Sequence, residues 1–155
     1  MLVLASLLLS VLLGLLLSRQ GRVAETPQRH KLRIGLSFDT LKEERWQRDR
    51  AAFVERAKQL GAEVIDLAAN SSDVQQMRDV ESLLTAQVNL LVIVAHNGAA
   101  MSKAVRLAHA AGVPVMAYDR LIPEPTLDFY ISFDAVAVGE KKARYLVDHL
   151  PTPGH

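Results

Sequence analysis

The sequence predicts an α/β fold built on a mainly parallel five-stranded sheet, preceded by an N-terminal hydrophobic helix. After His30, short β-rich apolar runs alternate with amphipathic stretches of helical period. Several of these runs are apolar almost throughout, as at Leu90 to Ala95, which is typical of strands buried on both faces of a parallel sheet. The chain has 155 residues, 50% of them hydrophobic, and this suffices for one such core.

The first 30 residues stand outside this pattern. Residues 1–18 are an apolar run that predicts a signal peptide or a membrane anchor, and residues 19–30 form a polar linker. No basic residue precedes the run, and Arg19 follows it almost at once, where a cleavage site would be expected. Both details count against a standard cleaved signal. The segment predicts contact with a membrane, through export or through anchoring.

Five runs are predicted to be strands. The stretch between the fourth and the fifth, Asp119 to Asp128, contains Pro123 and Pro125 and is too short and too broken for a crossover helix. Spacing alone therefore predicts an antiparallel hairpin for the last two strands. The predicted strands are residues 32–38, 63–69, 90–95, 113–118 and 129–133.

Four helices are predicted between and after these strands. The first ends at Gly61, which suits a C-terminal cap. The second begins with Ser72 and Gln75, which have the spacing of a capping box. Gly112 closes the third helix and Pro151 ends the fourth. The residues predicted to face inward are Phe53, Val54, Ala57 and Leu60, then Val74, Met77, Val80 and Leu84, then Met101, Ala104, Ala108 and Ala111, and lastly Val136, Gly139, Ala143, Leu146 and Leu150.

Candidate site residues follow the predicted strands. Ligands of an open parallel sheet bind beyond the carboxyl ends of its strands, so these positions meet at one edge. Carboxylates there can accept hydrogen bonds from sugar hydroxyls, guanidinium groups can donate in a fixed fork, and an indole can cover the C–H face of a ring. The candidates are Arg45, Trp46, Asn97, Asp119, Arg120 and Asp134.

Several candidates have a purely structural explanation as well. Trp46 lies two turns before Phe53 at helical spacing, which fits a core residue equally well. Arg45 stands in a charged run that is typical of a solvated, salt-bridged helix face. Asp134 has the position of a helix N-cap. The residues alone leave these alternatives open.

Composition and motifs argue against several function classes. The formal net charge of +1, from 18 basic and 17 acidic residues, gives no footprint for a nucleic-acid partner. There is no cysteine, no GxSxG elbow, no glycine-rich phosphate loop and no HExxH, and the five histidines lack ligand spacing. His96 could be a general base, but no nucleophile stands near it in the sequence. We expect no enzyme, no cofactor and no metal.

Four stretches together resemble one protein family. They are Glu44 to Arg50, Asn97-Gly98, Ala117 to Arg120, and Asp128 to Asp134 with Val138-Gly139-Glu140 after it. In this order and spacing they are similar to the first lobe of the D-xylose-binding periplasmic proteins, the receptors of an ABC sugar importer. The resemblance covers roughly residues 31–150 and implies a three-layer Rossmann-like lobe. It also implies that the fifth strand joins in parallel without a helix, and here we follow the resemblance rather than the hairpin.

The resemblance implies a substrate-binding component of a transport system for a xylose-like pentose, placed in the periplasm or otherwise outside the cytoplasm. The implied partners are the monosaccharide and the membrane subunits of the importer. Arg45 and Trp46 would supply a donor and a stacking face, and Asp119 and Arg120 would bind neighbouring sugar hydroxyls. Asn97 and Asp134 would bind, shape the site or cap helices. Ala135 stands where the family tends to have asparagine, which removes an amide near the interlobe edge.

Proteins of this family close two lobes over the sugar. This chain reaches His155 about where the family enters its second lobe, and residues 151–155 are predicted to be a truncated tail. One lobe leaves one side of the sugar in water, so we expect weak or undetectable xylose binding by the chain alone.

Three other functions are alternatives to a transport receptor. A membrane-tethered sugar-sensing subunit that acts with a sensor histidine kinase is the main alternative, and the uncleaved-looking leader favours it. The sugar-sensing half of a repressor would need a helix-turn-helix where the leader stands. A flavodoxin-like enzyme would need a phosphate loop, which the sequence lacks.

Overall fold

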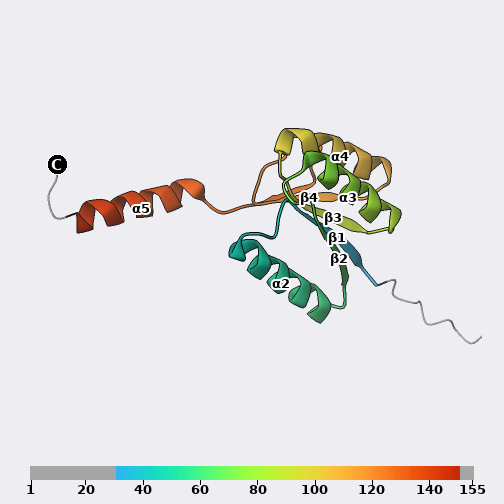
Figure 1. Ribbon diagram of the computed structural model, residues 1–155, viewed down its shortest axis with the longest axis horizontal. Coiled ribbons are helices and arrows are strands. Elements are labelled where there is room, and N and C mark those ends of the chain that lie inside the picture. Colours follow the sequence, from blue (N-terminus) through green and yellow to red (C-terminus); the bar gives the residue numbers. More distant parts are fainter. Residues whose placement is uncertain (1–30, 151–155) are drawn as a thin grey trace, which may run out of the picture. The chain divides into compact units, whose positions relative to one another are not determined.

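The computed structural model describes residues 31–150, so the predicted leader, linker and tail lie outside the described residues. One sheet contains β1 (Arg33–Phe38), β2 (Glu63–Ala68), β3 (Leu90–Val94), β4 (Val115–Tyr118) and β5 (Phe129–Ile131). The strand order is β2-β1-β3-β4-β5, and each neighbouring pair is parallel (Figure 1). The predicted α/β fold with a five-stranded sheet is confirmed.

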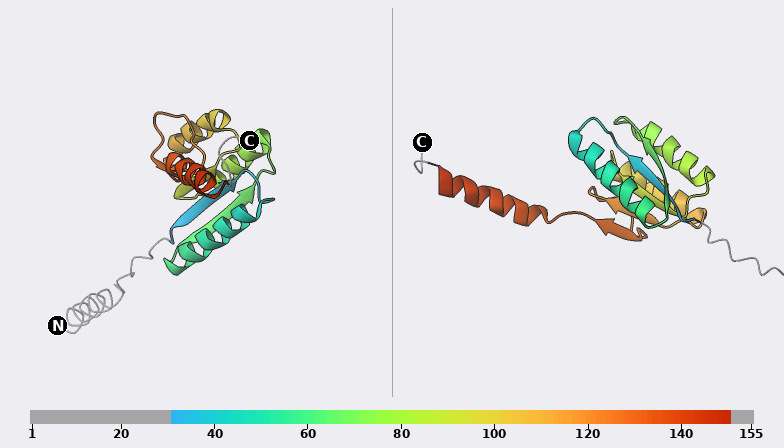
Figure 2. Two further views of the ribbon diagram at one scale, coloured as in Figure 1. Left: turned by 90° about the vertical axis from the view of Figure 1, so that its left-hand side faces the viewer. Right: turned by 90° about the horizontal axis from the view of Figure 1, so that it is seen from below.

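Three helices cover the two faces of this sheet: α2 (Glu44–Gln59), α3 (Asp73–Thr85) and α4 (Gly98–Ala110). A fourth helix, α5 (Ala135–His149), follows β5 and has no buried residue. Figures 1 and 2 show α2 on one side of the sheet and α3 with α4 on the other. The three-layer arrangement is thus present. Within residues 31–150, no helix has both the length and the apolar character that a membrane span requires.

Each face of the sheet carries its own core. Leu91 and Ile93 of β3 point into the cluster formed with α3 and α4. Val92 and Val94 of the same strand point into the cluster formed with α2. A strand covered in this way buries every residue, which explains the unbroken apolar run that the sequence shows there.

The connection from β4 to β5, residues 119–128, lies along α4. Arg106 of α4 pairs with Glu124, and the Nε2 atom of His109 lies 2.7 Å from Asp128 Oδ2. Ile122 of the connection is only 1% exposed. The connection runs beside α4 and returns to the edge of the sheet where β4 begins. For this reason β5 runs parallel to β4. The hairpin predicted from spacing is wrong, and the parallel strand implied by the resemblance is confirmed.

The predicted caps at Gly61, Ser72 and Gly112 are present, whereas Pro151 lies outside the described residues. The predicted inward faces are correct only in part. Gly61 and Gly112 both have positive φ, +80° and +72°, and the Ser72 hydroxyl accepts from the amide of Gln75 at 3.2 Å. In α3, however, Val74 is 64% exposed. In and next to α2, α3 and α4, the positions expected to face inward that are instead exposed are Leu60, Val74 and Ala111.

Helix α5 differs from the other three helices because it has no buried residue. Val136, Leu146 and Leu150 are 72%, 57% and 61% exposed. The prediction that the apolar residues of this helix, Gly139 and Ala143 included, face an inward core is wrong for the described part of the chain. The amphipathic pattern is real, but no element within residues 31–150 covers its apolar side.

Candidate functional site

The C-terminal edge of the sheet brings together the two predicted residue pairs. Arg45, in the first turn of α2, forms an ion pair with Asp119, 74 residues later at the end of β4. Arg45 Nε also lies 3.6 Å from Asp49 Oδ2, one helical turn on. The Cζ atom of Arg120 is 5.9 Å from the centroid of the Trp46 ring. Arg45, Trp46, Asp119 and Arg120 are therefore neighbours in space.

Trp46 is nearly buried, with 5% of its surface exposed. Its ring is tilted against Phe38, with 6.3 Å between the ring centroids. The Cζ atom of Arg45 lies 4.4 Å from the Trp46 ring centroid. Contacts of this kind hold a guanidinium group over an aromatic face. The indole thus supports the arginines, and its stacking on a sugar stays a prediction.

Asp119 has a left-handed backbone, with φ of 66°. The amide of Arg120 donates to the carbonyl oxygen of Tyr118 at 2.8 Å, which is the hydrogen bond of a γ-turn centred on Asp119. The carbonyl oxygen of Asp119 accepts from the hydroxyls of Tyr130 at 3.2 Å and Ser132 at 3.0 Å. Strained turns that neighbouring bonds maintain gather at functional sites. This turn aims two charged side chains at the edge of the sheet.

Asp39, directly after β1, also lies at this edge, although it is not among the six candidate residues. It is 3% exposed. Its Oδ2 atom accepts a hydrogen bond from Arg120 Nη1 at 2.7 Å, and His96 Nδ1 lies 2.9 Å from its Oδ1 atom. Arg120 Nη1 also donates to the carbonyl oxygen of Ala95 at 2.9 Å. Its position after a strand was the signal that could have found this residue.

A second residue that the sequence analysis missed, Gln76 of α3, is fully buried beneath this edge. Its Nε2 atom donates to the carbonyl oxygen of Val94 at 2.9 Å and to the Ser37 hydroxyl at 3.3 Å. Its Oε1 atom accepts from the amide of His96 at 2.8 Å. One amide therefore ties α3 to the ends of β1 and β3 and fixes the backbone that carries His96.

Asn97 and Asp134 cap helices. Asn97 Oδ1 accepts from the amide of Ala100 at 3.3 Å at the start of α4. Asp134 Oδ1 accepts from the amide of Ala137 at 2.9 Å at the start of α5. Within residues 31–150, no hydrogen bond or ion pair joins either side chain to the arginines of the edge. A role for either residue in binding a ligand stays a prediction.

Gly98 allows α4 to approach the connection that carries Arg120. A Cβ atom built on Gly98 would lie 2.3 Å from the carbonyl oxygen of Leu121, a distance that side chains do not tolerate. The Asn97-Gly98 motif therefore requires glycine, because any side chain at position 98 would collide with the backbone of Leu121. It keeps the start of α4 and the segment after Arg120 in direct contact.

Two groups at the edge, Arg45 and Tyr118, have pKa values above their ordinary ones. The hydrogen bond with Asp119 is the main cause that raises the pKa of Arg45 above its ordinary value, so the guanidinium stays charged. Burial, and then a 2.8 Å hydrogen bond to Asp49, raise the pKa of Tyr118, so its phenol stays neutral. No cluster of three or more metal-binding side chains occurs within residues 31–150. Arg45, Asp119 and Arg120 thus offer charged donors and acceptors for hydroxyl groups.

Comparison with known proteins identifies similar chains. The family described as "Periplasmic binding protein domain" matches residues 34–155. The D-xylose-binding periplasmic protein of Escherichia coli (strain K12) is 40% identical over 146 residues, covering 94% of this chain and 43% of that protein. This chain therefore spans less than half the length of that relative.

Two solved structures share the fold. A carbohydrate transporter solute-binding protein from Chloroflexus aurantiacus, in complex with D-glucose, is 39% identical with a TM-score of 0.72 and covers 79% of this chain and 36% of its own. A fructose-binding periplasmic domain of a hybrid two-component system is 27% identical with a TM-score of 0.66 and covers 77% of this chain and 40% of its own. By their names, both bind small solutes.

Proposed function

The chain belongs to the periplasmic binding protein family, and from this we propose that it is the substrate-binding component of an ABC transport system for a xylose-like pentose. One observation carries the proposal: Arg45, Asp119 and Arg120 converge where parallel sheets bind their ligands. Identity of 40% to a D-xylose-binding relative supports the choice of sugar. The family consists of binding proteins, which supports a binding role rather than an enzymatic one.

The edge supplies the groups that a pentose requires. The Asp119 carboxylate accepts hydrogen bonds from hydroxyls, and the guanidinium groups of Arg45 and Arg120 donate them. Hydrogen bonds to charged groups contribute about 1.5–3 kcal/mol each. Phe133 is 53% exposed, and its ring centroid lies 5.8 Å from Arg45 Cζ. Because Trp46 is nearly buried, we infer that Phe133 is the more accessible face for the C–H side of the sugar.

The proposed partners are a monosaccharide and the membrane subunits of an importer. The matched relative is named as a periplasmic protein, which supports a periplasmic or otherwise extracytoplasmic location. Residues 1–18 would serve export or anchoring.

The sharpest test places this lobe in a complete binding protein. We define the two-lobe chimera as the E. coli relative with residues 31–150 of this chain in place of its matching segment. We expect calorimetry to show D-xylose binding by the chimera. We expect Arg120→Met to weaken that binding about tenfold or more, because a charged hydrogen-bond donor is lost.

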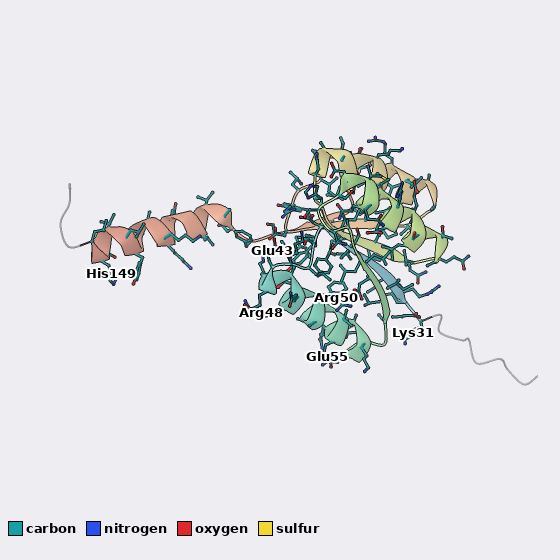
Figure 3. The ribbon with its side chains drawn as sticks, viewed as in Figure 1. Lys31, Glu43, Arg48, Arg50, Glu55 and His149 are labelled. Atoms are coloured by element: carbon teal, nitrogen blue, oxygen red, sulfur yellow. The ribbon has the colours of Figure 1, made fainter. Side chains whose placement is uncertain are left out.

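Arg48→Met is the matched control, because Arg48, on the outer side of α2, pairs within residues 31–150 only with Glu44 (Figure 3). Its dissociation constant should change less than about twofold, since exposed helix pairs contribute little. A chimera that folds and binds no pentose, or one that the Arg120 change leaves unaffected, would overturn the proposed function.

A membrane-tethered sensory subunit is the second candidate, favoured by the similarity to a periplasmic domain of a hybrid two-component system. The test is to express the chain with its leader and to ask whether the mature protein keeps residues 1–30 and fractionates with membranes. Retention favours the sensor, and release of a chain that begins after the leader favours the transport receptor.

A further inference from the structure

We propose that Asp39 is the positioning residue of this edge, which holds the Arg120 guanidinium in one orientation and shares its carboxylate with His96. The proposal rests on the proposed function, because Arg120 is taken to be a sugar donor. It assigns roles to Asp39 and His96, which the family motifs described above do not include.

The first observation is the burial of Asp39. Its side chain is 5% exposed, whereas the Arg120 side chain is 40% exposed. A buried carboxylate is costly unless charged donors compensate it, so the Arg120 head group must stay in place to pair with it. The pair therefore anchors one end of a guanidinium whose other end reaches solvent.

The second observation concerns which nitrogen of Arg120 is used. Both hydrogen bonds, to Asp39 Oδ2 and to the carbonyl oxygen of Ala95, are donated by Nη1. Within residues 31–150, Nε and Nη2 donate no hydrogen bond to protein atoms. A guanidinium is a rigid planar fork, so fixing Nη1 also fixes the directions of Nε and Nη2. Two donors are left in defined directions for a ligand.

The third observation concerns the remaining oxygen of the carboxylate. Asp39 Oδ1 is buried and has no hydrogen bond of good geometry in the described chain, although His96 Nδ1 lies 2.9 Å away. A small rotation of the imidazole would let an Nδ1–H group donate to this oxygen. The backbone of His96 is itself fixed by Gln76. His96 thus lies against the carboxylate oxygen that Arg120 does not use.

The orientation of Arg120 can be measured without sugar. In a fixed guanidinium the two Nη groups give separate NMR signals, and free rotation merges them. We expect separate Arg120 signals in the full chain and merged signals in Asp39→Asn. Asp66→Asn is the matched control, because Asp66 also pairs with an arginine, Arg50 at 2.5 Å, away from the edge. That change should merge the Arg50 signals and leave those of Arg120 separate.

Sugar binding supplies the second readout, because a merely structural role would not affect it selectively. In the two-lobe chimera we expect Asp39→Asn to raise the D-xylose dissociation constant about tenfold, and Asp66→Asn to change it less than about twofold. If Asp39→Asn does not fold, Asp39→Glu tests the proposal instead, because it keeps the negative charge but moves the carboxylate by one methylene. It should shift the Arg120 signals and weaken binding.

Two results would overturn the proposal. Merged Arg120 signals in the wild-type chain, or separate signals that survive Asp39→Asn, would show that Asp39 does not hold the guanidinium. An unchanged dissociation constant in Asp39→Asn would show that the orientation does not matter for the sugar. If the unmodified chimera binds no sugar at all, the proposed function fails, while the Arg120 signals still decide the positioning role.

Discussion

Two positions at the edge of the sheet, 119 and 98, accept few residue types. Asp119 adopts a φ of 66°, which aspartate, asparagine and glycine tolerate far better than other residues. Gly98 stands where any Cβ atom would meet backbone. Both positions lie in motifs that carry the family resemblance, so conformation and space explain part of those motifs before any ligand is considered.

Asp119→Asn should separate stability from binding. Asparagine adopts the left-handed conformation and keeps the shape of the side chain, while the charge that pairs with Arg45 is lost. Because Arg45 is 48% exposed, that pair contributes about 1 kcal/mol or less to folding. We expect a thermal melt close to that of the wild type and xylose binding by the chimera at least about tenfold weaker. Asp119→Val, which cannot adopt the turn easily, should lower the melting temperature clearly.

Gly98→Ala should destabilise the chain by about 1–3 kcal/mol, because overpacking forces the backbone apart. The contact at 2.3 Å is with a backbone carbonyl oxygen, which cannot move aside as a side chain would. Urea unfolding measures the change. Gly139→Ala is the control, since nothing lies within 4 Å of its added Cβ atom. A Gly98→Ala variant as stable as this control would contradict the close approach of α4 to residue 121.

For helices and strands, features that depend on neighbouring residues could be predicted from the sequence, and features that depend on distant contacts could not. The glycines at 61 and 112 and the cap at Ser72 depend on a few neighbouring residues, and the sequence contains all of them. The direction of β5 depends on the path of residues 119–128 over α4, which spacing does not encode. In α5 the pattern shows that one side is apolar without showing what covers it.

The buried face of α3 was predicted only in part, for a related reason. Glutamine is usually a surface residue, but the side chain of Gln76 is buried and makes three hydrogen bonds in the core. Gln76→Leu should cost about 1–3 kcal/mol in the free energy of unfolding, because it leaves the amide of His96 and the carbonyl of Val94 without this partner. Gln59→Leu, at the exposed end of α2 where the Gln59 amide bonds the exposed Arg56 and Glu55, should change it by less than about 1 kcal/mol. Equal effects of the two substitutions would contradict the assigned network.

The free energy of unfolding should depend on pH because of Asp128, which ends the connection from β4 to β5. The Val115 amide, at 2.8 Å, and then His109 hold the pKa of Asp128 below its usual value. A carboxyl whose folded pKa is depressed stabilises the fold above its unfolded pKa, near 4, and this contribution is lost as pH falls through the folded pKa. Urea unfolding measures the free energy of unfolding of the wild type and of Asp128→Asn. We expect the variant to be less stable than the wild type at about pH 6, and this difference to shrink as the pH falls to about 2.5. A constant difference would contradict the assignment.

Across the whole molecule, the site is where separate parts of the chain meet. The meeting of Arg45, Asp119 and Arg120 at one edge could be predicted, because the strand-end rule and the family motifs both point to them. Asp39 and His96 also come soon after strands, but their proposed roles depend on the contacts of Asp39 with Arg120 and with His96, which no motif indicates. This lobe presents those groups on one side only, so a sugar bound here alone would keep part of its surface in water.

A calorimetric titration of D-xylose into the full chain and into the two-lobe chimera tests the central claim most directly. The claim is that this edge is half of a sugar site. It predicts measurable binding by the chimera and binding by the full chain that is weaker by about a hundredfold or more, since hydrogen bonds of about 1 kcal/mol each are missing from one side. Micromolar binding by the full chain alone, or no binding by a folded chimera, would contradict it.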